Sequence, residues 1–372
     1  MIPLAIEKIY IEKDARAYEL TEKICRQINA PAQVVDRLDI VFSEVLSALD
    51  PVQKGKSILC LTKNKGPFLK KCPGTSTYTC CGYKILHIGT FCFMDCSYCI
   101  LQTYFHPPLM QFFVNHETLE KELADLFKQG SISRIGTGEF TDSMIWENWT
   151  GLSKLLVDKF SRQSRAVLEL KTKTVAIDGL EGLNHNRKTI MSWSLNTEKV
   201  IHDEERGTAP LSVRLKAASK CMHWGYPLAF HFDPLVLYDH CEADYCAVID
   251  QLFNQISPDQ IVWISLGTFR YMPALKQIIM KRFKRSKIPF GEFIPGLDGK
   301  MRYFKPLRIK LYRKIVQHIR SRAPGVTVYF CMEDDEVWQE SLGFIPEEKG
   351  GLAKLLDDSA VEKCGLDKSA IS

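Results

Sequence analysis

Between residues 83 and 285 the sequence alternates short apolar runs with amphipathic stretches of helical length. The apolar runs, which have the composition of buried strands, are YKILHIGT, SISRIGTG, AVLELKT, TIMSWSLN, YPLAFHFDP and QIVWISLG. The stretches with helical periodicity between them include ETLEKELADLFKQG, LSKLLVDKF, LSVRLKAASKCMHWG, YCAVIDQLFNQI and YMPALKQIIMKRF. Because such alternation places successive strands side by side in the same direction, this region should form a parallel sheet covered by helices.

Six strand–helix units fit into this region, two fewer than a closed eight-unit barrel needs. The sequence therefore predicts an α/β fold whose core, residues 83–285, is an open, partial (β/α)6 barrel. In barrels of this kind the functional residues lie in the loops at the carboxyl ends of the strands. Those loops are where site residues are sought below.

The segments that flank the barrel have different patterns. Residues 1–82 contain the helical patterns AYELTEKICRQI and VVDRLDIVFSEVL and predict a helical, cysteine-containing extension. Residues 286–345, with the helix PLRIKLYRKIVQHIRSR and a last strand VTVYFCM, predict a segment that closes the barrel. Residues 346–372 are polar and predict a loosely held tail.

Composition excludes several classes of protein. The chain has 372 residues, of which 45% are hydrophobic and 25% charged, so it should fold rather than remain disordered. No run approaches the ~18 consecutive apolar residues of a membrane span, and the amino terminus becomes charged too early for a signal peptide. We expect a cytoplasmic protein with no membrane partner, and the sequence leaves the oligomeric state open. The net charge of +5 permits a polyanionic partner without demanding one.

The chain has thirteen cysteines, of which seven lie between residues 60 and 99. Their odd number, without a secretory signal, favours thiols or metal ligands over disulfides. Directly after the first predicted strand, TFCFMDCSYCI places Cys92, Cys96 and Cys99 in a C-x3-C-x2-C arrangement. Three thiolates leave one iron of an iron–sulfur cube open to an outside ligand, whereas a structural zinc site normally has a fourth protein ligand. The alternatives are reduced structural cysteines and a zinc site completed by His87, His106 or an earlier cysteine.

This cysteine spacing, on the loop after strand one of a βα barrel, resembles the radical S-adenosylmethionine superfamily. The resemblance implies a [4Fe–4S] cluster held by Cys92, Cys96 and Cys99, with S-adenosylmethionine bound at the open iron through its amino and carboxylate groups. It further implies reductive cleavage of that cofactor and abstraction of a substrate hydrogen by a 5′-deoxyadenosyl radical. An external electron donor, such as a flavodoxin or a ferredoxin, is implied as well.

Polar residues at the ends of later strands match positions that the superfamily uses for this cofactor. Glu139, in the segment GTGEF after strand two, matches the position of a carboxylate that binds the methionyl ammonium. Lys171, at the end of strand three, matches the position of a residue that pairs with the methionyl carboxylate. Ser194 and Asn196, at the end of strand four, match positions from which side chains reach the ribose hydroxyls. The alternative for each of them is ordinary polar capping of a strand end.

Arg206, in EERGT, and His231 with Asp233, in HFDP, follow strands four and five and are weaker candidates for the same role. Groups in these positions would face the same mouth of the barrel. Their alternative is hydrogen bonding to neighbouring loops. All three residues are expected near the cofactor.

A narrower resemblance begins at CSYCILQTYFHPPLMQFFVN and continues through TDSMIWENWT, SLNTEKVIHDEERGT and VTVYFCM. These segments, within about residues 80–331, are similar to spore photoproduct lyases, which repair a thymine–thymine photoproduct in DNA. The resemblance implies an enzyme of the carbon–carbon lyase class that acts on DNA or a nucleotide-like substrate. Tyr98 matches one tyrosine of the relay that returns the radical in those enzymes.

Two departures from the lyases bear on the repair reaction. Glu139 and Phe140 stand where the lyases carry a hydrogen-donating cysteine, and Ile100 replaces a second relay tyrosine. A substitute thiol would have to come within near-contact distance of the substrate radical. The cysteines considered for this role are Cys221, Cys241, Cys246 and Cys331. The alternatives are therefore a radical S-adenosylmethionine enzyme with a non-nucleic-acid substrate, or a non-enzymatic iron–sulfur or zinc module.

The remaining features of the cysteine-rich region are less specific. Cys60, Cys72, Cys80 and Cys81 precede the first barrel strand, and CPGTSTYTCCGY contains three of them. Because two are adjacent and none forms a C-x2-C pair, we expect buried or loop thiols rather than an auxiliary cluster. The basic run KRFKRSK, residues 281–287, predicts either a phosphate contact or a solvated helix end.

Overall fold

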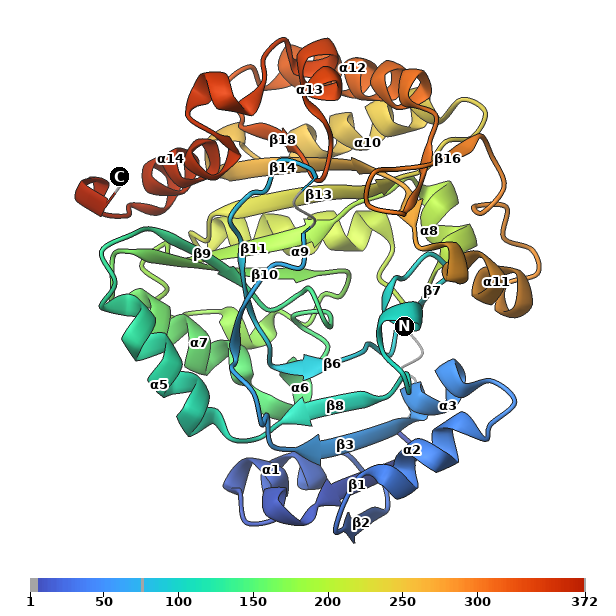
Figure 1. The fold of residues 1–372 in the computed structure, drawn as a ribbon. Helices are drawn as coiled ribbons and strands as arrows, with labels where there is room; N and C mark the ends of the chain where they lie inside the picture. Colours follow the sequence, from blue (N-terminus) through green and yellow to red (C-terminus); the bar gives the residue numbers. More distant parts are fainter. Residues whose placement is uncertain (1–5, 75–76, 371–372) are drawn as a thin grey trace.

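The computed structural model describes residues 6–74 and 77–370. Two large sheets organise this part of the chain, one with eight strands and one with five. The five-stranded sheet is built mainly from the N-terminal segment and lies on the opposite side of the molecule from the C-terminal strands of the larger sheet (Figure 1).

The eight-stranded sheet is the predicted barrel core. From edge to edge its strands are β18 (Val328–Phe330), β14 (Ile261–Thr268), β13 (Leu228–Leu235), β11 (Thr189–Ser194), β10 (Ala166–Thr172), β9 (Ser133–Gly136), β5 (Lys84–Leu86) and β4 (Leu69–Lys71). All neighbours are parallel except β4 with β5. The predicted partial (β/α)6 barrel is confirmed, with β18 as an additional parallel strand.

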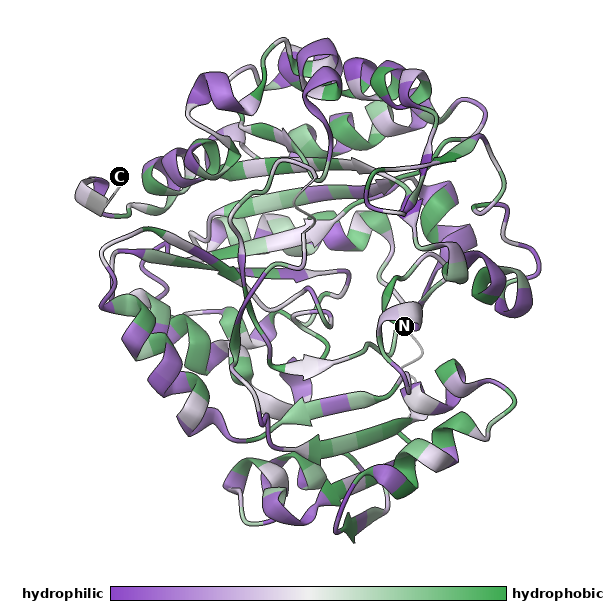
Figure 2. Cartoon of the chain, viewed as in Figure 1, coloured by the Kyte–Doolittle hydropathy of each residue, from purple (hydrophilic) through white to green (hydrophobic). Residues whose placement is uncertain are grey.

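The central strands are buried on both faces, which explains their continuous apolar runs. Every residue of β11 is buried, and in β10 only Lys171 is partly exposed. Helices α7 (Leu152–Ser161) and α9 (Leu211–His223) pack on the central strands, and α10 (Cys241–Gln255) packs beside α9, as a parallel sheet requires. The other helices of this region are α5 (His116–Phe127), α6 (Glu147–Thr150), α8 (Glu198–Glu204) and α11 (Pro273–Arg282). Figure 2 shows apolar residues along the strands and mixed polarity on the outer helices.

The N-terminal segment is a second sheet rather than a purely helical extension. In spatial order its strands are β2 (Ala32–Val35), β1 (Lys8–Glu12), β3 (Ile58–Thr62), β8 (Met110–Phe113) and β6 (Gly89–Thr90). The helices of this segment are α1 (Glu19–Gln27), α2 (Asp39–Leu46) and α3 (Pro51–Ser57). These strands have β-branched residues in the runs KIYIE, AQVV and ILCLT. They are short and lie between segments with helical periodicity, so the sequence pattern did not reveal them.

The closing segment crosses the open side of the barrel. Its strands β17 (Met301–Tyr303) and β16 (Phe293–Pro295) form a small antiparallel sheet with β15 (Arg270–Tyr271), which belongs to the end of the barrel core. The long helix α12 (Lys305–Arg322) leads into β18, and α13 (Asp335–Leu342) follows it and packs on α12. None of the described helices combines the length and the apolar character that crossing a membrane would require.

The C-terminal tail contradicts the prediction of a loosely held segment. Helix α14 (Leu352–Cys364) packs on β14, and a stripe four residues apart along it is buried. That stripe consists of Leu352, Leu356, Ala360 and Cys364. Lys188 donates to the carbonyl oxygens of Cys364, at 2.8 Å, and Gly365, at 2.9 Å, at the end of the helix. The tail looked polar because its outer face is charged, but its inner face continues the core.

We predict that Leu356→Ala, at the centre of this stripe, lowers the free energy of unfolding by about 2–5 kcal/mol because it leaves a cavity in the core. The exposed Glu362→Ala on the same helix should change it by less than ~0.5 kcal/mol. Denaturant unfolding of both variants measures the difference. Equal small effects would mean that the helix contributes little to the core.

Candidate active site

A cavity of about 760 Å³ lies at the carboxyl ends of the barrel strands. Its lining includes most of the residues that the sequence singles out: Cys92, Cys96, Tyr98, Cys99, Glu139, Lys171, Ser194, His231 and Asp233. These residues come from the loop after β5 and from the ends of β9, β10, β11 and β13. The fold therefore gathers one group of thiols and one group of polar side chains around a single cavity.

Backbone pairing holds the loop that carries the three thiols. Strand β7 (Asp95–Cys96) pairs antiparallel with β12 (Glu205–Arg206), and Cys96 lies opposite Glu205. The Cys99 amide donates to the Cys96 carbonyl at 3.2 Å, and the Met94 amide donates to the Cys92 sulfur at 3.4 Å. All three thiols consequently line the cavity instead of the core beneath the loop.

A buried ionic network fixes the same loop from below. Lys56, at the end of α3 and only 2% exposed, donates to the Asp95 carboxylate at 2.8 Å and to the Met94 carbonyl. Arg282, at the end of α11, approaches Asp95 at 3.0 Å and Asp50 at 2.9 Å. Burial favours the neutral carboxyl, but Lys56 and Arg282 outweigh it and lower the pKa of Asp95. Arg282 belongs to the basic run 281–287, so this residue is structural.

Burial favours the protonated thiols of Cys92 and Cys96. Burial raises the pKa of Cys96 to about 12 and that of Cys92 well above its ordinary value. In the described part of the chain no three His, Cys, Asp or Glu side chains converge closely enough to hold one metal ion. His87 packs between the rings of Phe113 and Phe140 and lies outside the cavity lining. The described residues therefore do not assemble a zinc site that includes His87. In an iron–sulfur cluster each cysteine binds a different iron, so the cysteine sulfurs lie farther apart than the ligands of a single ion.

Glu139 and Lys171 form the charged end of the cavity. Burial opposes the charge of Lys171, but the carboxylates of Glu139, Glu169 and Asp233 outweigh it and raise the pKa of the ammonium. A Cβ atom on Gly138 would lie 3.1 Å from the Ser143 hydroxyl and 3.2 Å from the Lys171 carbonyl. The glycine beside Glu139 thus permits close packing of its loop against the end of β10.

His231 and Asp233 also face the cavity, each with a fixed partner. His231 Nε2 lies 2.7 Å from Glu169 Oε1. Burial opposes ionisation of Glu169, but His231 and other neighbours lower its pKa to about 2. Asp233 forms an ion pair with Arg270 at 3.1 Å. Both residues are pre-oriented polar groups of the cavity wall.

Two of the predicted cofactor residues do not line the cavity. The Asn196 amide donates to the Pro234 carbonyl at 2.8 Å and accepts from the Tyr245 hydroxyl at 2.8 Å, so its side chain is engaged in the loop. Arg206 is exposed, and its guanidinium lies 4.7 Å from the centre of the Phe283 ring. Asn196 lies two residues beyond the cavity residue Ser194, but its side chain is held by the loop instead.

Tyr98 lines the cavity and is tied to a buried ion pair. Its hydroxyl donates to Glu205, which binds Arg214 at 2.5 Å. Burial, together with the charge of Glu205, raises the pKa of Tyr98 well above its ordinary value, so the phenol keeps its proton. Ile100 and Phe140 also line the cavity.

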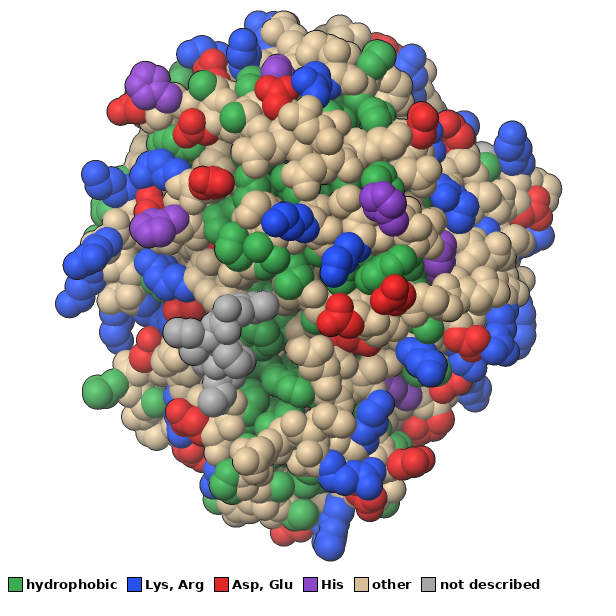
Figure 3. Space-filling view, turned by 180° about the vertical axis from the view of Figure 1, so that it is seen from behind, with side chains coloured by type: hydrophobic (Ala, Val, Ile, Leu, Met, Phe, Trp, Pro, Cys, Tyr) green, Lys and Arg blue, Asp and Glu red, His purple; other side chains and the backbone are tan. Residues whose placement is uncertain are grey.

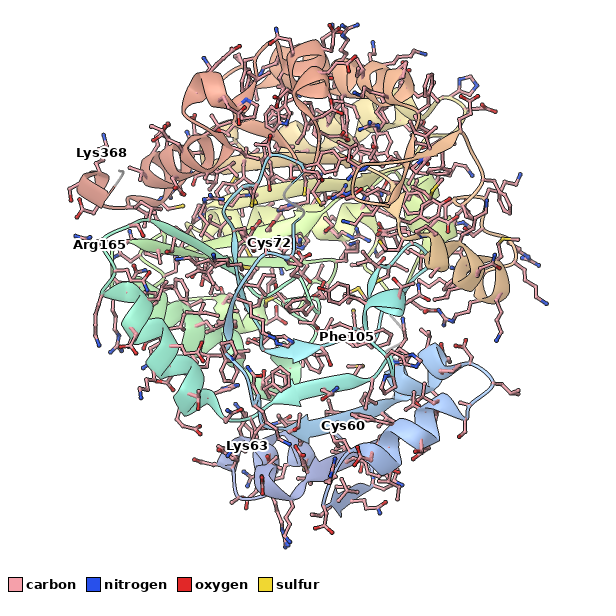
Figure 4. All side chains as sticks on the ribbon, in the orientation of Figure 1. Cys60, Lys63, Cys72, Phe105, Arg165 and Lys368 are labelled. Atoms are coloured by element: carbon pink, nitrogen blue, oxygen red, sulfur yellow. The ribbon has the colours of Figure 1, made fainter. Side chains whose placement is uncertain are left out.

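Of the four cysteines considered as a substitute hydrogen donor, the fold brings one to the cavity. Cys331 lines the cavity, whereas Cys221, Cys241 and Cys246 do not. Three of the earlier cysteines, Cys72, Cys80 and Cys81, line it as well. Figure 4 shows Cys72 near the centre of the molecule and Cys60 on the N-terminal sheet, where Cys60 is fully buried. In the sequence, the adjacent cysteines in CPGTSTYTCCGY were the available sign of thiols near the site. Only the fold shows that Cys331 lines the same cavity.

Comparison with known proteins gives a consistent family. The family model described as spore photoproduct lyase matches residues 4–293. The spore photoproduct lyase of Bacillus subtilis is 27% identical over 209 residues, which cover 55% of this chain and 61% of that protein, less than two thirds of its length. The spore photoproduct lyase of Clostridium acetobutylicum is 23% identical over 309 residues, which cover 80% of this chain and 86% of that one.

Solved structures of spore photoproduct lyase have the same fold. A mutant with dinucleoside spore photoproduct superposes with a TM-score of 0.77 at 22% identity, covering 88% of this chain and all of the other, 100%. Another mutant, with bound AdoMet and dinucleoside spore photoproduct, gives a TM-score of 0.77 at 21% identity with the same coverage of 88% and 100%. Since the family model extends from the N-terminal sheet to β16, the chain belongs to the spore photoproduct lyase family.

Proposed function

We propose that this chain is a radical S-adenosylmethionine enzyme that abstracts a hydrogen atom from DNA or a nucleotide-like substrate. The observation that carries the proposal is that Cys92, Cys96 and Cys99 line the same cavity as the charged pair Glu139 and Lys171. When bound, a [4Fe–4S] cluster and S-adenosylmethionine supply one-electron reductive cleavage of the cofactor. An external low-potential donor, such as a flavodoxin or a ferredoxin, supplies the electron.

The residues of this chain bind and orient those groups. Cys92, Cys96 and Cys99 ligate three irons and leave the fourth open. Glu139 accepts hydrogen bonds from the methionyl ammonium, and Lys171 pairs with the methionyl carboxylate. Ser194, at the end of β11, lines the cavity and has a hydroxyl suited to the ribose. Asn196 and Arg206 contribute by shaping the neighbouring loops.

The cavity also limits contact with water during the reaction. Cys92, Cys96 and Tyr98 are at most 9% exposed. Phe140 and Phe269 add apolar walls beside them. Excluding water from such a site strengthens its electrostatic interactions and protects a reactive radical from side reactions.

A nucleotide-like substrate is supported by the family and by the shape of the site. A cavity of about 760 Å³ is of the size that encloses a small ligand, so a lesion in DNA would have to be turned out of the helix. Phe269 stacks on Tyr271 at a centroid distance of 5.1 Å and provides an aromatic surface at the wall.

The charged surface supports local contacts to phosphates near the cavity. Figure 3 shows acidic and basic side chains interspersed on the face seen from behind Figure 1, without a continuous basic surface there. The first turn of helix α11 lies at the cavity, where Met272 and Ala274 are lining residues. The helix ends in the basic run 281–287. Within that run Lys281, Lys284, Arg285 and Lys287 are exposed.

A second candidate is the same chemistry on a substrate other than nucleic acid. Glu139, Phe140 and Ile100 line the cavity, where the resemblance to the lyases would have a thiol and a phenol. Neither a carboxyl nor a phenyl group offers the weak X–H bond that quenches a carbon radical. This observation favours a reaction in which the product radical is quenched differently from the repair reaction of the lyases.

We predict that the reduced, cluster-containing protein cleaves S-adenosylmethionine to 5′-deoxyadenosine and breaks the carbon–carbon bond of dinucleoside spore photoproduct, which restores two separate thymine nucleosides. Cys96→Ala, which removes one cluster ligand, should form neither product. Chromatography of anaerobic reactions with and without the lesion measures both. Cleavage of the cofactor without repair of the lesion would support the second candidate, and no cleavage by a protein with a full iron complement would refute the enzyme.

We predict that Glu139→Gln and Lys171→Met each weaken S-adenosylmethionine binding by roughly tenfold to a hundredfold, as expected for loss of a hydrogen bond to a charged group. Lys70→Met, on β4 outside the cavity lining, is the matched control and should bind normally. Equilibrium binding to the reconstituted protein measures the affinities. Unchanged binding in both site variants would exclude them from the cofactor site.

We predict that Tyr98→Phe retains its iron but consumes several times more S-adenosylmethionine per product, because the relay hydroxyl bonded to Glu205 is lost. Tyr104→Phe, a half-exposed tyrosine of the same cavity, should behave as wild type. The ratio of 5′-deoxyadenosine to product measures the effect. An unchanged ratio in Tyr98→Phe would show that this phenol takes no part in radical return.

A further inference from the structure

The basic run 281–287 is fastened to the loop that carries the three thiols. Arg282 approaches Asp95 of that loop at 3.0 Å. The hydroxyl of Ser286 donates to the Glu204 carboxylate at 2.7 Å, and the same carboxylate accepts from the Ser97 hydroxyl. The Ser97 amide also donates to the Glu204 carbonyl at 2.8 Å. The two anchored loop residues flank the middle thiol, so the run has a fixed position beside it.

A single strand pairing separates Cys96 from the protein surface. In the antiparallel pair of β7 and β12, Cys96 lies opposite Glu205, and the next residue of β12 is the exposed Arg206. The Arg206 guanidinium lies 4.7 Å from the ring centre of Phe283, which belongs to the basic run. Neither Arg206 nor any residue of the run lines the cavity. Arg206 and the run therefore form one surface on the outer side of the loop, where α8, β7 and α11 lie together in Figure 1.

The exposed cations of this surface carry uncompensated positive charge. They are Arg206, Lys281, Lys284, Arg285 and Lys287, which together are called the outer basic patch. Within the described part of the chain none of them forms an ion pair, whereas Arg282 pairs with Asp50 and Asp95. A further carboxylate on the neighbouring α8, Asp203, is paired with Lys199. The outer basic patch is therefore free to attract an acidic partner.

The position of the patch indicates which acidic partner it suits. The proposed function, on which this inference rests, needs one electron from an external carrier, while cofactor and substrate occupy the cavity side of the thiols. Since electrons cross protein rapidly only over short distances, the carrier must approach the loop from its outer side. Electron-transfer complexes bury less than ~1,200 Å², and charge complementarity supplies much of their association rate. A compact patch beside Cys96 meets these needs, whereas DNA has to reach the cavity, which the patch does not line.

We propose that the outer basic patch is the docking surface for an acidic one-electron carrier protein, which reduces the cluster through the loop. The exposed cations steer the carrier to the surface, and the buried contacts of Arg282 and Ser286 keep that surface aligned with the loop. One electron passes from the carrier to the cluster: the carrier is oxidised by one electron, the cluster is reduced by one, and no bond forms or breaks.

The test measures by stopped-flow absorbance how fast a reduced, acidic flavodoxin reduces the cluster of the reconstituted chain. Lys284→Glu/Lys287→Glu should slow this reduction by about tenfold or more at low salt, and added salt should diminish the difference. The matched control, Lys121→Glu/Lys128→Glu, changes the net charge equally at exposed positions of α5 and the residue after it, across the molecule in Figure 1. Because distant charges are screened, the control should stay within about twofold of wild type. Dithionite, which needs no docking surface, should reduce all three proteins at one rate.

Equilibrium binding of oxidised flavodoxin and of a duplex oligonucleotide, both without S-adenosylmethionine, gives a second readout. Weaker flavodoxin binding by Lys284→Glu/Lys287→Glu than by the control supports docking, whether or not the oligonucleotide is affected. Unchanged flavodoxin binding with weaker oligonucleotide binding would assign the patch to nucleic acid and overturn the proposal. Equal behaviour of the two variants, or no flavodoxin binding by wild type, would overturn it as well. Failure of wild type to cleave S-adenosylmethionine with dithionite would refute the proposed function instead, and the binding result does not depend on it.

Discussion

The fixed position of the loop that carries Cys92, Cys96 and Cys99 is the constraint on which the site depends. Asp95 lies within this loop and is held by Lys56 from the N-terminal sheet region and by Arg282 from α11. Buried charges of this kind are tolerated only when they are paired, and losing one partner costs several kcal/mol. The N-terminal segment and the helix after the last barrel strand therefore cooperate to place one loop.

The sequence predicted the elements whose signal is local. The runs that form β10 and β11 are continuously apolar because both faces are buried, and their ends correctly located Lys171 and Ser194 at the cavity. The N-terminal strands were missed because their partners are distant, as when β3 pairs with β8. Asn196 lies two residues beyond Ser194, but only the folded loop shows that Tyr245 and Pro234 occupy its amide.

The cavity combines properties that the sequence presents separately. Polar residues at successive strand ends suit S-adenosylmethionine, while apolar and aromatic walls suit a nucleobase. Glu139 occupies a position where the resemblance to the lyases would place a thiol, yet other thiols enter the cavity from both edges of the sheet. In this account the family's fold and cofactor site are retained, while the distribution of sulfur around the substrate is altered.

In the proposed function, Cys92, Cys96 and Cys99 would hold a [4Fe–4S] cluster that binds S-adenosylmethionine through the cofactor's amino and carboxylate groups. Electron–nuclear double resonance on the reduced protein tests it most directly, with S-adenosylmethionine labelled by 15N in the amino group and by 17O in the carboxylate. The account predicts couplings from both labels in wild type, and loss of both in Cys96→Ala. A reduced cluster that shows no coupling to either label, with the cofactor present at saturation, would contradict the account.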